Sequence, residues 1–166
     1  FAYGEWGWGL LPAILLTGGP SRPTAFHGRE VSAGTDLWHY ADELRAGRMS
    51  QDEFAELEAA STTSYGHCNE MGTASTMAAL VEALGMSLPG TATIPAVSAA
   101  RARAAEATGR RAVELAVEGL APRQILTTEA FDNAITLLAA VGGGTNAVVH
   151  LLALAGRVGV PLTLDR

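Results

Sequence analysis

The sequence is poor in cysteine and in charged residues. Cys68 is the only cysteine among 166 residues, so no disulfide can form within the chain. Charged residues amount to 17%, and 11 Lys+Arg against 17 Asp+Glu leave a net charge of −6. Because an acidic surface repels phosphate backbones and anionic lipids, we expect neither a nucleic acid nor a membrane as a partner. The arginines from Arg101 to Arg111 form no basic patch, since Glu106 lies among them.

Long apolar runs and a signal-peptide pattern are also missing. The longest stretch without a charged residue, 133–156, is divided by three glycines at 142–144. Its two pieces are too short to cross a bilayer. A single cysteine and no leader pattern fit a reducing compartment, so we expect a cytoplasmic protein.

Apolar residues make up 48% of the chain, which excludes a disordered protein and predicts a packed core. We expect one helix-rich α/β domain over residues 1–166, in which several helices pack one or two strands. Helices are predicted wherever apolar residues recur every three or four positions. The ranges are 37–44, 51–57 after the capping box Ser50–Glu53, 77–84, 98–119 with a candidate break at Gly109, 128–138, and 145–155 with Val148, Leu151, Leu152 and Ala155 inward.

Extended structure is predicted at two places. The apolar run Leu10–Leu16 is short and is followed by glycine and proline, which favours a buried strand. Residues 91–97 are predicted to form a second, shorter extended segment. The stretch 17–34, rich in glycine, proline and serine, is expected to be a loop.

Cys68 is the first candidate for chemistry. It lies in a polar segment just before a predicted helix, where main-chain N–H groups and the helix dipole favour the thiolate that binds iron or attacks an electrophile. The alternative is a small buried apolar residue, which is the usual place of a lone cysteine. Without a second cysteine, the chain cannot supply a complete thiolate set for an iron–sulfur cluster or a structural zinc.

Two glycine-containing segments also lead into helices. Residues 142–146 (GGGTN) and 72–76 (GTAST) place free N–H groups and hydroxyls where a carboxylate or phosphate can bind. For the first segment, a tight turn between two packed helices explains the glycines equally well. It also lacks the lysine of a phosphate-binding loop.

Eight segments of the chain carry a resemblance to known proteins, and they occur in the same order. They are Leu11–Ala13, Gly18–Pro20, Ser32–Trp38, Cys68–Met77, Glu82–Gly90, Ala130–Ala134, Gly142–Ala147 and His150–Leu151. Together they resemble the dihydroxy-acid and sugar-acid dehydratase family. His67 before the cysteine, together with Gly34-Thr35-Asp36, is more similar to the sugar-acid branch. The resemblance covers the chain from about Leu10 to its end.

The resemblance implies a hydro-lyase that converts a 2,3-dihydroxy carboxylic acid or sugar acid, its small-molecule partner, to a 2-keto acid. It implies an iron–sulfur cluster, of the 2Fe–2S type in sugar-acid members, held by three cysteines, a nearby Mg²⁺, and a homo-oligomer. It also implies that a serine alkoxide from a carboxy-terminal domain takes the substrate proton. Only Cys68 carries over as a cluster ligand; His67, Gly72, Thr73, Ser75 and Thr76 carry over as the surroundings of the cluster or substrate.

The sequence departs from the family in ways that bear on activity. Residues 1–9 contain none of the cysteine, aspartate and lysine that the family has there, and are a divergent or non-native start. Gly144 stands where the family usually has serine. We therefore expect an incomplete amino-terminal domain that is inactive as an isolated chain. The alternatives are a non-catalytic module that packs against a partner, and an anion-binding module that uses the helix starts at Thr73 and Asn146.

Overall fold

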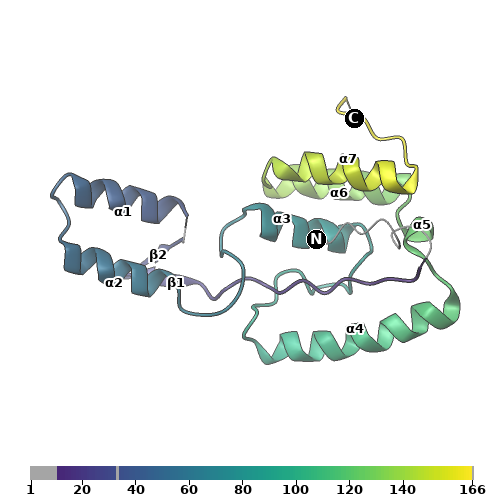
Figure 1. Cartoon of the computed structure of the whole chain (residues 1–166), viewed down its shortest axis with the longest axis horizontal. Helices are drawn as coiled ribbons and strands as arrows, with labels where there is room; N and C mark the ends of the chain where they lie inside the picture. The colour runs from purple at the N-terminus through teal and green to yellow at the C-terminus, as the bar shows by residue number, and fades with distance from the viewer. Residues whose placement is uncertain (1–10, 33, 166) are drawn as a thin grey trace.

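The computed structural model describes residues 11–32 and 34–165, and in them the chain is helix-rich, as predicted. Figure 1 shows a hairpin and two helices on one side, and a larger group of helices on the other. In chain order, the described elements are β1 (Thr24–Phe26), β2 (Arg29–Val31), α1 (Thr35–Arg45), α2 (Gln51–Ser61), α3 (Thr73–Ala83), α4 (Ala99–Glu118), α5 (Pro122–Ile125), α6 (Thr128–Val141) and α7 (Asn146–Val158).

The larger core lies between α3, α6 and α7, which contact one another. Their predicted inner faces are largely confirmed, because apolar residues spaced three and four apart lie along one side of each helix. The prediction for α7 was wrong at Val148, which is 40% exposed, while Leu154 is buried in its place. The buried residues of this core include Met77, Leu80, Val81, Phe131, Ala134, Ala147, Leu151, Leu154 and Ala155.

A smaller core joins α1 and α2 to a β-hairpin that the sequence analysis had assigned to a loop. Strands β1 and β2 pair antiparallel, with Thr24 opposite Val31. The two residues between the strands, His27 and Gly28, both have positive φ angles (47° and 76°), as a tight hairpin turn requires. Phe26 and Val31 pack there against Leu57 of α2. The strands were missed because each has only three residues.

The capping box predicted before α2 is confirmed. The Ser50 hydroxyl accepts a hydrogen bond from the Glu53 N–H at 3.2 Å, and the Glu53 carboxylate accepts one from the Ser50 N–H at 2.9 Å. The two bonds satisfy N–H groups that a helix start leaves without partners.

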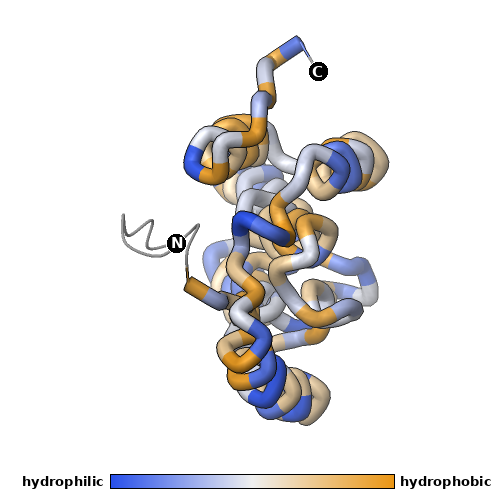
Figure 2. Tube along the Cα trace, turned by 90° about the vertical axis from the view of Figure 1, so that its right-hand side faces the viewer, coloured by the Kyte–Doolittle hydropathy of each residue, from blue (hydrophilic) through white to orange (hydrophobic). Residues whose placement is uncertain are grey.

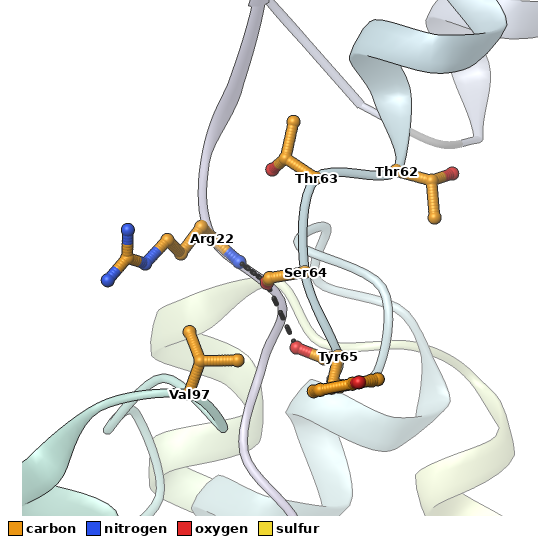
Figure 3. Close-up of a pocket in the computed structure, with 6 residues that line it drawn as sticks. All are labelled: Arg22, Thr62, Thr63, Ser64, Tyr65 and Val97. Atoms are coloured by element: carbon orange, nitrogen blue, oxygen red, sulfur yellow. Dashed lines mark hydrogen bonds between the residues drawn. The ribbon is translucent and has the colours of Figure 1, made fainter.

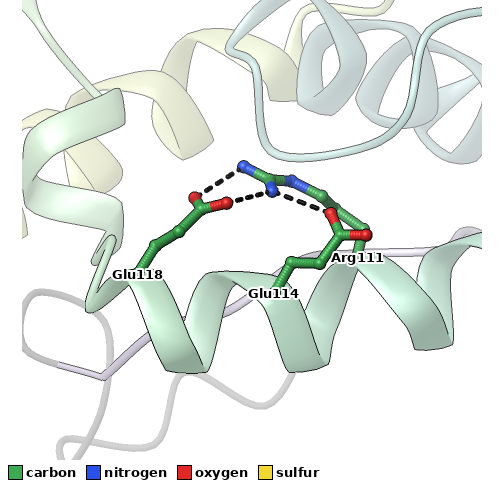
Figure 4. A network of polar contacts seen from close by, with 3 residues as sticks. All are labelled: Arg111, Glu114 and Glu118. Atoms are coloured by element: carbon green, nitrogen blue, oxygen red, sulfur yellow. Dashed lines mark hydrogen bonds and ion pairs between the residues drawn. The ribbon is translucent and has the colours of Figure 1, made fainter.

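Helix α4 runs without interruption from Ala99 to Glu118, so the candidate break at Gly109 does not occur. Arg111 donates hydrogen bonds to Glu114 at 3.0 Å and to Glu118 at 2.7 Å (Figure 4). These carboxylates raise the pKa of the guanidinium, Glu118 more than Glu114. Because the two carboxylates are exposed and Arg111 is only half-buried, the pairs add little to stability.

Neither predicted extended segment forms a regular strand in the described residues. Residues 11–19 belong to no sheet, and Leu15 donates its N–H to the Met86 carbonyl at 2.8 Å; Leu10 lies outside the described residues. Residues 91–97 form consecutive turns, in which the Thr91 hydroxyl donates to the Leu88 carbonyl at 2.7 Å. Both predictions were therefore wrong as strands, because an apolar pattern does not reveal whether a paired strand is available.

Within the described residues, no helix is both long and apolar enough to cross a membrane. In Figure 2, hydrophilic and hydrophobic residues are mixed along the tube.

Candidate functional site

Cys68 lies in the loop that joins α2 to α3, five positions before the first residue of α3, and its side chain is exposed. The prediction of a cysteine in a polar segment before a helix is confirmed. The alternative of a small buried apolar residue was wrong, since Cys68 is exposed. An exposed thiol is open to a metal or to an electrophile.

Main-chain pairing fixes the loop next to Cys68. His67 donates its N–H to the Gly19 carbonyl at 3.0 Å, and accepts a hydrogen bond from the Ser21 N–H at 2.8 Å. These bonds form an isolated parallel bridge between Pro20 and His67. The pairing brings residues 19–21 against the loop so closely that a Cβ at Gly66 would overlap main-chain atoms of Pro20 and Ser21. The cysteine is therefore presented from a defined backbone.

A buried arginine stabilises the segment around residues 17–21 that pairs with this loop. Arg101 of α4 is only 8% exposed and donates to the Thr17 carbonyl at 2.8 Å and to the Ile94 carbonyl. The guanidinium occupies the space that a Cβ at Gly19 would need. Burial lowers the pKa of Arg101, because removal from water disfavours the charged form. Its Nε and the Thr17 hydroxyl are buried without hydrogen-bond partners in the described structure.

This role of Arg101 was not predicted from the sequence, where Arg101 is only one of several arginines that form no basic patch. No local pattern reveals it, because Thr17 and Arg101 are 84 positions apart. The one available signal is the pair of glycines at 18–19, which permits a close approach to the backbone.

His67 and Ser75 lie beside the main chain of Cys68. His67 Nδ1 is 3.0 Å from the Cys68 carbonyl oxygen. Since a carbonyl only accepts, Nδ1 is the protonated nitrogen of this bond. The Ser75 hydroxyl donates to the Glu70 carbonyl at 2.7 Å and lies 3.4 Å from His67 Nδ1. His67 Nε2 is buried without a hydrogen-bond partner in the described structure.

The hydroxyls at the start of α3 hold the glycine turn before α7. Thr76 accepts a hydrogen bond from the Gly144 N–H at 2.9 Å, and Thr73 accepts one from the Asn146 side-chain amide at 2.7 Å. A Cβ at Gly143 would lie 2.7 Å from Thr76 Cγ2, so only glycine allows this approach. The interpretation of the glycine run as a tight turn between packed helices is thus confirmed. Gly72, the residue before α3, completes this helix start.

Cys68 is the one metal ligand that the resemblance carried over to this chain. Among the residues that the structure describes, no group of three or more His, Cys, Asp or Glu side chains could hold a metal ion. Residues 1–9, the predicted divergent or non-native start, lie outside the described residues.

Comparison with known proteins identifies the family. The family model described as dihydroxy-acid/6-phosphogluconate dehydratase N-terminal matches residues 9–166. The chain belongs to this dehydratase family. It is 53% identical to an L-arabinonate dehydratase from Rhizobium leguminosarum bv. trifolii, 48% to a D-xylonate dehydratase from Caulobacter vibrioides, and 46% to a dihydroxy-acid dehydratase from Methanospirillum hungatei. Each comparison covers 93% of this chain but only 26–28% of the relative, so the chain spans about a quarter of their length.

Proposed function

We propose that this chain is the amino-terminal part of a hydro-lyase that removes water from a sugar acid or another 2,3-dihydroxy acid to leave a 2-keto acid. In this proposal Cys68 supplies one thiolate to an iron–sulfur cluster whose other ligands come from outside the described residues. The observation that carries the proposal is an exposed thiol on a fixed loop, in a chain whose relatives are named dehydratases of such acids.

The residues around Cys68 can provide one ligand of a cluster site. The thiol is exposed, and its loop is fixed by the pairing with residues 19–21. The described chain offers no further thiolate and no group of three metal-binding side chains. When bound, an iron with an open position would act as a Lewis acid toward a leaving hydroxyl. The part of this chain is to orient Cys68, through the His67 ring that holds its carbonyl and through the main chain of residues 66–67.

A chimera tests the proposal. Residues 11–165 would replace the corresponding segment of the Rhizobium leguminosarum L-arabinonate dehydratase, whose own remaining parts would supply the other ligands. After anaerobic reconstitution with iron and sulfide, we expect visible absorbance from a cluster in the chimera, and none in the isolated chain, which has one thiol. Cys68→Ser should remove the absorbance from the chimera.

The matched control is Met71→Leu. Met71 is exposed in the same loop and carries the nearest other sulfur along the sequence, so its loss should leave the absorbance unchanged. The proposal fails if Cys68→Ser keeps a full complement of iron and sulfide in the chimera. It also fails if the isolated chain assembles a stoichiometric cluster that does not depend on Cys68.

A further inference from the structure

The Cys68 loop is anchored differently before and after the cysteine. Before it, the loop bonds to the segment that leads into β1. The Arg22 main-chain N–H donates to the Ser64 hydroxyl at 2.8 Å (Figure 3). Three positions further along, His67 pairs with residues 19–21 through its own main chain. The loop is therefore held at several points as far as His67.

After the cysteine, the main chain of residues 68–71 has fewer partners. In the described part of the chain, each hydrogen bond that reaches it comes from one of two side chains, His67 and Ser75. The Ser75 hydroxyl lies 2.7 Å from the Glu70 carbonyl oxygen and 3.4 Å from the Cys68 carbonyl oxygen. A hydroxyl has one proton to donate, so the nearer Glu70 oxygen receives it. Ser75 thus ties the residues that follow the cysteine to α3.

The first turn of α3, which carries Ser75, is itself held by the larger core. The next two residues, Thr76 and Met77, are buried, and the Thr76 hydroxyl accepts the Gly144 N–H at 2.9 Å. Helix α3 also packs against α6 and α7. The bond from Ser75 to Glu70 therefore fixes the segment after the cysteine relative to this core.

We propose that Ser75 is a positioning residue for Cys68, whose hydroxyl holds segment 68–70 on α3 so that the thiol keeps one direction. The inference rests on the proposed function, because the direction of the thiol matters for binding a cluster. Cys68 lies between two anchors, His67 on residues 19–21 and Glu70 on Ser75. Without the second anchor, the main chain after the cysteine gains conformational freedom, which is then lost when the thiolate binds.

The order of Cys68 can be measured without any metal. Because Cys68 is the only cysteine and is exposed, a nitroxide spin label attaches to it alone in the 166-residue chain. Ser75→Ala should narrow the electron paramagnetic resonance lines of the label, since the segment becomes more mobile. Alanine is the best helix former, so the circular dichroism of the chain should stay unchanged. Ser75→Thr keeps the hydroxyl and should restore the broader lines.

The matched control is Ser61→Ala. The Ser61 hydroxyl donates to the Glu58 carbonyl at 2.8 Å at the end of α2, so this variant loses the same kind of hydrogen bond at another place. It should leave the spectrum of the label unchanged. Equal line widths in Ser75→Ala and Ser61→Ala would overturn the proposal.

The chimera tests whether a cluster uses this order. Ser75→Ala should shorten the half-life of the cluster absorbance under an iron chelator about two- to tenfold, as the loss of one neutral hydrogen bond implies. Ser75→Thr should recover the half-life, and Ser61→Ala should not change it. A cluster that survives Cys68→Ser would overturn the proposed function. A cluster that depends on Cys68 but has equal half-lives in Ser75→Ala and Ser61→Ala would overturn this inference alone.

Discussion

Replacing Arg101 by methionine should loosen the support of the Cys68 loop. Methionine keeps most of the length of the aliphatic chain, and removes the guanidinium that donates to the Thr17 and Ile94 carbonyls. Segment 17–21 would then lose its tie to α4, while its own bonds to His67 remain. The perturbation thus acts on the loop through the segment beneath it.

The size of the effect follows from two opposing contributions. A hydrogen bond from a charged donor contributes about 1.5–3 kcal/mol, so two such bonds set an upper limit near 6 kcal/mol. Arg101 is 8% exposed and forms no ion pair with a carboxylate among the described residues, so removal of this buried cation offsets part of that loss. We expect Arg101→Met to lower the free energy of unfolding by about 2–4 kcal/mol, a large share of the 5–15 kcal/mol typical of a domain.

Urea unfolding measures the global effect, and amide hydrogen exchange measures the local one. Exchange at His67 and Ser21, whose N–H groups form the bridge, should accelerate more than exchange at Leu80 in the core. Arg103→Met makes the same chemical change at an exposed site on the same helix, and should leave both measurements nearly unchanged. Equal urea midpoints for the two variants, with equal protection at His67, would refute the reasoning.

Two further predictions concern packing and pH. Gly143→Ala should destabilise the chain by about 1–3 kcal/mol in urea unfolding, because its Cβ would lie 2.7 Å from Thr76 Cγ2; at Gly144→Ala the nearest atoms are 3.7 Å away, so equal losses in both variants would contradict this. The Ser32 N–H, which donates to Asp36 at 2.7 Å, is the main cause that lowers the pKa of that carboxyl below its ordinary 3.8. Asp36 should therefore stabilise the fold above that pH, and the advantage over Asp36→Asn should vanish as the pH falls through the lowered value. A difference in urea midpoint that stays constant down to pH 2 would contradict it.

Local signals predicted the helices because each signal lies within a few residues of the element it controls. The capping box of Ser50 and Glu53 spans four positions and needs no tertiary partner. Apolar spacing identified the inner face of α6, with Phe131 and Ala134 fully buried, for the same reason. The error at Val148 shows the limit: spacing defines a stripe, whereas the neighbouring helices decide which edge of the stripe they cover.

The strands and the support of the site depended on contacts between distant segments. Three-residue strands such as Thr24–Phe26 are too short for alternation to stand out, and the two-residue turn at 27–28 is recognisable only when its flanks are known to pair. Position 68 could be placed in a polar loop before a helix from sequence alone. Its main-chain partners at 19–21 could not, since nothing in either segment specifies the other.

The main chain of the Cys68 loop is fixed while the thiol stays exposed, and this bears on what the chain contributes to a cluster. The main chain at 66–67 is fixed by segment 19–21, which Arg101 ties to α4, whereas the thiol itself remains exposed. A ligand held on a fixed backbone loses less conformational entropy on binding than one on a mobile loop. Under the proposed function, one thiolate provides too little affinity to retain a cluster alone, so the value of this segment lies in presenting Cys68 in advance. Arg101→Met should therefore reduce cluster occupancy in the chimera, although Arg101 lies on α4, away from the Cys68 loop, and contributes no ligand.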